Sequence, residues 1–305
     1  MLTSIASQYW HFILAQGVLG GFSSGMVLNP AFAATPQYFL KKRGAAIGLA
    51  IAGGSVGGVV FPLALPRLFD NGVRFDWAVR IIGFLVFALL ALSCMIIKER
   101  LPPRKNKFFL PRAFTETTYV LIIAAGFVTY LGMFSPYFFL PQYALNHGVD
   151  PLLSSYLIAI LNGSSFFGRV IPGILSDRLG RLNMLAAASL VSSILLFVWT
   201  QCNTRTTIVT FTVLYGFFSG GIISGIPTSL ASSAADASNT GTYIGQGSAI
   251  TALASLIGPP INGAFLVKYG GFQQLAIFSA VTCLVGSFIV LAAKPATKAG
   301  LTGIV

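Results

Sequence analysis

The 305 residues are 55% hydrophobic and only 9% charged, and their mean hydropathy is +0.82. About a quarter of the residues of a soluble domain are charged, so this composition excludes an ordinary soluble protein and predicts an integral membrane protein. The formal net charge of +12 does not indicate a nucleic-acid partner, because the basic residues form neither one patch nor one basic helix.

Nine apolar runs are long enough to cross a bilayer, which takes about 20 predominantly apolar residues per helix. Strands of a membrane barrel would be alternating segments of about ten residues, whereas these runs are apolar throughout. We therefore predict an all-α integral membrane bundle. The expected spans are 10–36, 44–66, 78–97, 115–141, 152–175, 183–201, 207–231, 243–267 and 272–293.

Lysine and arginine are distributed unequally between the two predicted sides of the membrane. Most lie in segments 37–43, 98–114, 176–182 and 294–305, which fall on one side. Cytoplasmic loops carry the excess of basic residues, so these segments are predicted to be cytoplasmic and the amino terminus to lie outside. The basic loop 98–114 then separates three spans in 1–97 from six spans and a short tail in 115–305.

The first span and the seventh span share a motif, Gly21–Gly25 in one and Gly216–Gly220 in the other. The spans that follow them also match, with Ile47–Gly48 parallel to Ile244–Gly245. Spans one to three thus repeat spans seven to nine, as in transporters built from internal repeats. We expect a six-plus-six architecture that lacks its first three helices, with a partial amino-terminal lobe and a complete six-helix carboxyl-terminal lobe.

Glycines recur every four residues in several spans, and such faces let helices approach closely. Static packing and a surface on which helices slide are both compatible with this pattern. The glycines are Gly17, Gly21 and Gly25, Gly54 and Gly58, Gly216 and Gly220, and Gly241 and Gly245.

Arg169 is the only charged residue that falls well inside a predicted span, about 9 Å from the cytoplasmic end at 1.5 Å per residue. An arginine at membrane depth costs at least about 2.5 kcal/mol and normally faces a cavity or a partner. No Asp or Glu lies deep in any span, so the predicted counter-ion is a solute carboxylate held by two hydrogen bonds. The alternative is that Arg169 snorkels to the interface or binds backbone carbonyls.

An acidic and basic turn follows Arg169 between spans five and six. Asp177 can accept hydrogen bonds from a helix amino terminus or pair with basic groups on a neighbouring helix, and Gly180 allows a tight reversal. A solvated loop of unrelated charges is the alternative. The predicted conformational-switch residues are Gly173, Asp177, Arg178, Gly180 and Arg181.

Other polar residues at membrane depth are candidates to line a solute cavity. The selected ones are Asn29, Tyr137, Asn162 and Ser165. For any single one of them, a hydrogen bond that merely joins two helices is the competing interpretation. The chain contains no His-Glu-x-x-His, phosphate loop or paired intramembrane aspartates, so we expect no enzyme, no metal and no cofactor.

Two stretches resemble a known family. Gly173–Arg181 resembles the G-x-x-x-D-R-x-G-R loop of the major facilitator superfamily, and Tyr38–Gly53 resembles the Y-F-x-K-R-R-x-x-A-x-G-x-A-x-A-G segment of its monocarboxylate porter branch, especially in fungi. The resemblance implies that spans one to nine correspond to helices four to twelve. It also implies that Arg169 contacts the substrate carboxylate and that transport is coupled to a proton. The acidic residue that those porters carry four positions before this arginine is Ser165 here.

We therefore expect a secondary transporter that moves a small organic acid or related metabolite by alternating access, with export of a secondary metabolite as one form. The resemblance implies the plasma membrane, with the vacuole or another internal membrane as the alternative. The competing hypothesis is a truncated membrane protein that does not transport, and that associates with another transporter or is a pseudogene product.

Overall fold

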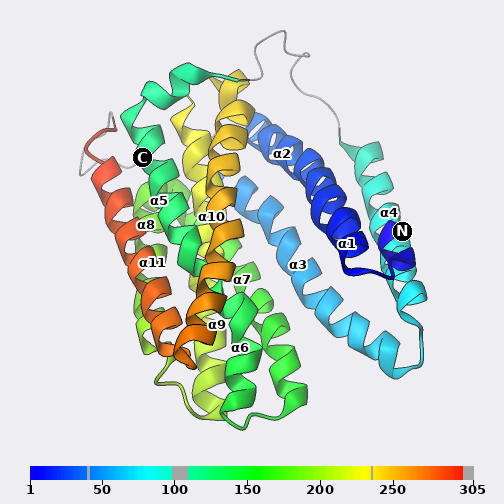
Figure 1. Ribbon diagram of the computed structural model, residues 1–305. Coiled ribbons are helices and arrows are strands. Elements are labelled where there is room, and N and C mark those ends of the chain that lie inside the picture. The colour runs from blue at the N-terminus through cyan, green and yellow to red at the C-terminus, as the bar shows by residue number, and fades with distance from the viewer. Residues whose placement is uncertain (40–41, 98–108, 235, 298–305) are drawn as a thin grey trace.

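The computed structural model describes residues 1–39, 42–97, 109–234 and 236–297. Within these ranges all long elements are helices, and nine helical segments are long and apolar enough to cross a membrane (Figure 1). They coincide with the nine predicted runs, so the prediction of an all-α membrane bundle is confirmed. Most of the basic loop 98–114 and the end of the tail lie outside the described residues.

The nine spans are built from helices of unequal length. The first span joins α1 (Tyr9–Phe12), a π-helical segment (Ile13–Gly20) and α2 (Gly21–Tyr38), and is followed by α3 (Arg43–Asp70) and α4 (Phe75–Ile96). The fourth span is divided into α5 (Thr117–Met133) and α6 (Ser135–Asn146). The remaining five are α7 (Pro151–Leu179), α8 (Arg181–Trp199), α9 (Arg205–Ser233), α10 (Thr240–Tyr269) and α11 (Gln273–Ala293). Short 3-10 helices cover Leu2–Ile5, Pro111–Thr115 and Ala237–Asn239.

Local sequence accounts for the bounds of the long helix α7. The Asp150 carboxylate accepts hydrogen bonds from the backbone N–H groups of Leu152 (3.0 Å) and Leu153 (3.3 Å), and Pro151 occupies the first helical position. This is the usual arrangement at a helix amino terminus. The helix ends at Leu179, and the following Gly180 has a φ of 91°, a conformation that residues with a β-carbon rarely adopt. The predicted tight reversal at Gly180 is therefore present.

Helices α5 to α11 surround one hydrophobic core. Its largest fully buried side chains include Trp199, Tyr119, Tyr143 and Tyr215. Helix α11 packs against α5 and α8, while α7 packs against α9. In Figure 1 these helices form the larger body, and α1 to α4 lie on one side of it.

The helix ends lie alternately on two faces of the bundle. Asp177 binds backbone groups at the start of α3, and the Tyr119 hydroxyl at the start of α5 donates to the Tyr243 carbonyl near the start of α10 (2.8 Å). At the opposite face the Tyr143 hydroxyl in α6 donates to the Trp199 carbonyl at the end of α8 (3.3 Å). The first face is the one whose loops carry most of the basic residues.

The amino-terminal helices are less enclosed than the others. Helix α4 has a single buried residue, Ala78, and packs mainly against α3 and the Leu2–Ile5 segment, with a further contact between the Phe75 ring and the Phe12 ring of α1. Helix α2 contacts α3 and α10. Helix α3 makes the most extensive contact with the larger body, along the length of α7. The pairing of α3 with α7 therefore carries most of the connection between the two parts of the molecule.

Candidate functional site

The predicted solute ligand and the predicted switch residue lie on the same face of α7. Residues four apart in an α-helix share a face, so Arg169, Gly173 and Asp177 form one stripe. All three contact α3, near Ile51, Gly48 and Gly44 respectively. The α3–α7 pair thus brings together the two motifs that the sequence singled out.

Arg169 is 7% exposed and reaches across to the other helix. Its Nη1 donates a hydrogen bond to the backbone carbonyl of Ile51 (2.8 Å), and its Nε is buried without a hydrogen-bond partner. Neither of the ion pairs among the described residues includes Arg169. The alternative of a bond to a backbone carbonyl is therefore the interaction present in this structure, and the cation has no carboxylate partner in the described part of the chain.

Two tyrosines, one from α5 and one from α6, lie close to the guanidinium. Tyr130 and Tyr137 lie close enough to interact with Arg169 electrostatically. The Tyr137 hydroxyl is 3.2 Å from the Ser219 hydroxyl on α9. The rings of Tyr130, Phe134 and Tyr137 follow one another edge to face, with centroids 5.3 and 5.8 Å apart. A cation beside phenol groups and aromatic edges is suited to an anion that carries an apolar body.

Tyr130 and Tyr137 lie on either side of the break between α5 and α6, and both interact with Arg169. The Ser135 hydroxyl follows the break, donates to the Gly132 carbonyl (2.7 Å) and lies 2.6 Å from the Ser279 hydroxyl on α11. These bonds satisfy polar groups where the regular helix is interrupted, which is required at membrane depth. The broken span is therefore held in place by its neighbour α11.

Asp177 caps the amino terminus of α3. Its Oδ1 accepts from the Gly44 N–H (2.9 Å) and its Oδ2 from the Ala45 N–H (3.1 Å). The Arg181 Nη2 lies 4.0 Å from the same carboxylate. A negative charge at a helix amino terminus satisfies free N–H groups and interacts favourably with the helix dipole. The predicted interaction with a helix terminus is present, and it joins segments far apart in the chain.

The other candidate residues are distributed unevenly. Asn162 lies against Gly58 of α3 and donates to the Ile158 carbonyl of its own helix (2.9 Å). Ser165 is fully buried, faces Gly220 of α9, and its hydroxyl has no hydrogen-bond partner.

Two further candidates lie on exposed positions. Asn29 donates to the Gly25 carbonyl of its own helix (3.1 Å) and is not gathered with the residues around Arg169. Arg178 is exposed, unlike Gly173 and Gly180 on either side of it in the motif.

Sequence reasoning missed the residues of α3 that contact Arg169. The Ile51 carbonyl has no residue-type signature, because every residue carries one. Gly54 was recognised only as one of a pair of small residues, yet a β-carbon at this position would lie 3.2 Å from the Arg169 Nη1. Ser219 belongs to the repeated motif Gly216–Gly220, which was the one available signal for it.

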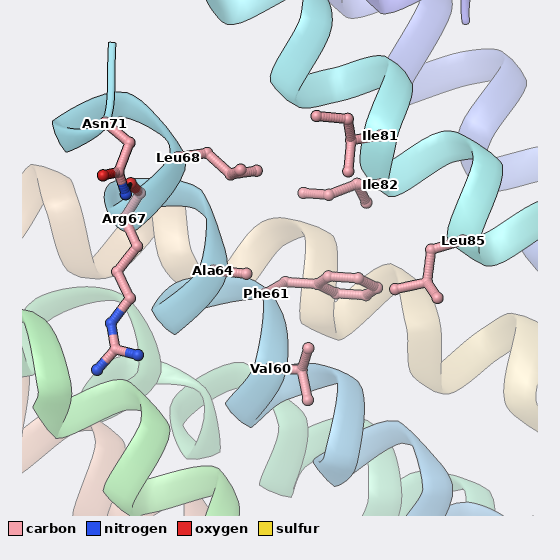
Figure 2. Close-up of a pocket in the computed structure, with 9 residues that line it drawn as sticks. All are labelled: Val60, Phe61, Ala64, Arg67, Leu68, Asn71, Ile81, Ile82 and Leu85. Atoms are coloured by element: carbon pink, nitrogen blue, oxygen red, sulfur yellow. Dashed lines mark hydrogen bonds between the residues drawn. The ribbon is translucent and has the colours of Figure 1, made fainter. Parts of the chain in front are cut away.

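A cavity of about 390 Å³ lies between α3 and α4, away from these residues. Figure 2 shows the Phe61 ring pointing toward Leu85, while the Arg67 guanidinium points away from the group. The lining is almost entirely apolar, without the convergent polar groups of a typical ligand site. Its residues are Val60, Phe61, Ala64, Arg67, Leu68, Asn71, Ile81, Ile82 and Leu85. Among the described residues, no group of three His, Cys, Asp or Glu is placed to hold a metal.

The profile of the Major Facilitator Superfamily matches residues 1–259 and 173–303 of this chain. The chain belongs to this superfamily. Two similar proteins are the aspyridones efflux protein of Emericella nidulans, 46% identical over 300 residues, and the agnestins efflux protein of Paecilomyces divaricatus, 35% identical over 306 residues. Both alignments cover 98% of this chain, but the chain spans only 62% and 69% of those proteins respectively.

Solved structures of the superfamily share the fold. The human organic anion transporter MFSD10 superposes with a TM-score of 0.73 at 15% identity, covering 95% of this chain and 73% of that one. The transporter FucP in its outward conformation superposes with a TM-score of 0.69 at 17% identity, covering 93% and 75%. This multi-pass membrane protein therefore has the superfamily fold. Its place in the monocarboxylate porter branch stays a prediction.

Proposed function

We propose that this chain serves the export of a small organic acid, such as a secondary metabolite, by alternating access between two helical lobes. The observation that carries the proposal is Arg169, a buried arginine at membrane depth with an unpartnered Nε and no carboxylate partner among the described residues. A solute carboxylate supplies the missing counter-charge through two parallel hydrogen bonds. Two relatives that are named as efflux proteins support export over uptake.

In this proposal the aromatic side chains around Arg169 hold the apolar body of the solute. Tyr137 offers a hydroxyl beside the guanidinium, and Tyr130 and Phe134 offer ring edges. Ser165 and Asn162 contribute polar groups one turn and two turns away from Arg169 on α7, respectively. Asn29 completes the proposed set only if α2 changes its position, since Asn29 is exposed and bonds within its own helix here.

The Asp177 cap acts as the closing contact at the predicted cytoplasmic face. While Asp177 accepts from Gly44 and Ala45, the amino terminus of α3 is held against the end of α7. Breaking these bonds would allow the two helices to separate at that end. A co-transported proton, which the family resemblance implies, would need a carrier other than residue 165, because serine does not ionise.

The organisation of the chain belongs to the same proposal. We assign 1–97 to a partial amino-terminal lobe, 98–114 to the connecting loop and 115–305 to the six-helix lobe, with the plasma membrane as the site of action. A second candidate function is association with another membrane protein without transport. It is favoured by the exposed glycine face of α2, where a β-carbon at Gly21 or Gly25 would meet no atom within 4 Å.

The test measures carboxylate binding to the purified 305-residue chain, with benzoate as the probe. Binding is monitored through the thermal unfolding of the chain in detergent. Binding to the folded state raises the unfolding temperature. We expect benzoate to stabilise the wild type and the control Arg205→Gln, an exposed arginine at the start of α9, but not Arg169→Gln. Arg169→Lys should retain only part of the effect, because ammonium is a point charge without the planar fork.

The proposed anion site is wrong if Arg169→Gln is stabilised by benzoate as strongly as the wild type, or if the wild type is not stabilised at all. The transport step is tested separately by benzoate efflux from proteoliposomes. Binding without efflux, together with recovery of the chain in a stable complex with a second membrane protein, would favour the association function.

A further inference from the structure

We infer that the Ile51 carbonyl is an internal substitute for the solute, so that a solute carboxylate binding at Arg169 releases α3 from α7. The inference rests on the proposed function of Arg169 as an anion ligand. The Arg169 Nη1 donates to the Ile51 carbonyl at 2.8 Å, across the contact between α3 and α7. The guanidinium therefore already holds an oxygen acceptor in the position that a solute oxygen would need.

The carbonyl is a replaceable partner. A helix carbonyl accepts from the N–H four residues later and has a second lone pair to offer, so Ile51 loses little when Arg169 leaves. A carboxylate brings a full negative charge and two oxygens, and hydrogen bonds between two ions are stronger than one to a neutral carbonyl. The unpartnered Arg169 Nε is a second donor that the carbonyl does not use. Exchange of the carbonyl for a carboxylate is thus favourable for the guanidinium.

Gly54 gives the guanidinium its access to α3. A β-carbon at Gly54 would lie 3.2 Å from Nη1, closer than ordinary van der Waals contact, whereas a β-carbon at the neighbouring Gly53 would meet nothing within 4 Å. These two adjacent glycines therefore differ in their relation to Arg169. Gly53 is a matched control for substitutions at Gly54.

The same two helices are tied at Asp177, about 12 Å along α7 from Arg169 at 1.5 Å per residue. Between these ties the backbones meet, since a β-carbon at Gly48 would lie 2.5 Å from the Arg169 carbonyl oxygen and 3.3 Å from the Gly173 Cα. The two sets of hydrogen bonds join the same rigid pair of helices. Loss of the Arg169 hydrogen bond therefore makes it easier for α3 to separate from Asp177. Solute binding is in this way linked to opening at the predicted cytoplasmic end.

Hydrogen exchange of the backbone amides at the start of α3 measures the separation of α3 from α7 without an attached probe. The N–H groups of Gly44 and Ala45 are protected by Asp177, so their exchange rate measures how often that end opens. The measurement uses the full chain in lipid nanodiscs, with and without benzoate, and compares wild type, Gly54→Val, Gly53→Val and Arg169→Gln. A peptide from α11 serves as the internal reference for global stability.

Without benzoate, we expect Gly54→Val and Arg169→Gln to exchange about tenfold faster at the start of α3 than wild type and Gly53→Val, as the loss of one charge-assisted hydrogen bond implies. Benzoate should accelerate this exchange in wild type and Gly53→Val. It should still bind Gly54→Val, as seen by thermal stabilisation, but change its exchange no further. The α11 peptide should exchange equally in all four proteins.

The inference is overturned if Gly54→Val exchanges like Gly53→Val, or if benzoate stabilises the wild type without accelerating exchange at the start of α3. Stabilisation of Arg169→Gln by benzoate would instead contradict the proposed function. Equal acceleration in α11 would show a general loss of stability and would also count against the inference. The effect of benzoate on exchange can be tested with the wild type alone. This part of the experiment is therefore valid even if a variant fails to fold.

Discussion

Helices α2 and α9 contain the same glycine motif but lie in different surroundings. In α9 a β-carbon at Gly220 would lie 2.5 Å from the Ser165 carbonyl oxygen, and one at Gly216 would overlap α7 as well. In α2 the matching Gly21 and Gly25 face open space. The glycine face of α9 is therefore used for a close helix contact, whereas that of α2 meets no neighbour among the described residues. Small residues make a close approach physically possible, but a second helix must be present to use it.

The third helices of the two repeats show the same difference. Helix α11 has buried residues along its length and packs on α5 and α8, whereas α4 buries Ala78 alone. Helix α5 contacts both α10 and α11, while their counterparts α3 and α4 enclose the apolar cavity of Figure 2. The two helices therefore contribute unequally to stability, and substitutions in each of them measure by how much.

The largest difference is expected between Leu275→Ala in α11 and Leu85→Ala in α4. Leu275 is 0% exposed and Leu85 is 47% exposed. A leucine deleted from a packed core costs about 2–5 kcal/mol, chiefly through lost contacts and the cavity left behind. We expect Leu275→Ala to lower the unfolding temperature in detergent markedly and Leu85→Ala to change it little. Equal effects would show that the cavity wall in α4 is as tightly packed as the core.

The next difference is expected between Gly220→Ala and Gly25→Ala. The added methyl group at Gly220 meets the Ser165 carbonyl, so α9 and α7 must move apart, at a cost of about 1–3 kcal/mol for overpacking. At Gly25 the methyl group meets no neighbour, and alanine favours the helix. Thermal unfolding should therefore move in opposite directions for the two variants. A loss of stability with Gly25→Ala would reveal a neighbour that packs on α2.

A smaller effect separates Asp177→Ala from Asp150→Ala. Both carboxylates accept from helix N–H groups, and loss of such a cap costs about 1 kcal/mol. Asp150 caps its own helix, whereas Asp177 caps α3 from α7. Hydrogen exchange should accelerate at the start of α3 only in Asp177→Ala and at the start of α7 only in Asp150→Ala. Acceleration of α3 in both variants would mean that α7 is loosened as a whole.

The smallest effect is expected from Tyr119→Phe, compared with Tyr9→Phe. The buried Tyr119 hydroxyl donates to the Tyr243 carbonyl (2.8 Å), and one such bond contributes about 1 kcal/mol net. Tyr9 is 81% exposed in the first span, so its hydroxyl should contribute nothing measurable. Denaturant titration in detergent should resolve the first change and not the second. If Tyr119→Phe left the free energy of unfolding unchanged, the α5–α10 contact would lie outside the part of the protein that unfolds cooperatively.

The helices could be predicted from the sequence because a membrane helix satisfies its backbone hydrogen bonds within itself. Length and hydropathy were therefore sufficient for all nine spans among the described residues. The Asp177 contact with a helix terminus was also predictable in kind, because a carboxylate beside a tight turn has few other partners. Asn29 was selected by the same polarity argument as Asn162, yet only Asn162 faces a neighbouring helix. Polarity alone does not indicate which way a residue points.

By itself the sequence determined that this protein is a membrane bundle of apolar helices with an internal repeat and one buried arginine, since these properties depend on local composition and spacing. Only the tertiary structure decided which helix Arg169 and Asp177 contact, and that both contact α3. The physical reason is that their partners are backbone groups. Every residue offers a carbonyl and nearly every residue an N–H, so the choice among them depends on which helices pack together and not on side-chain identity.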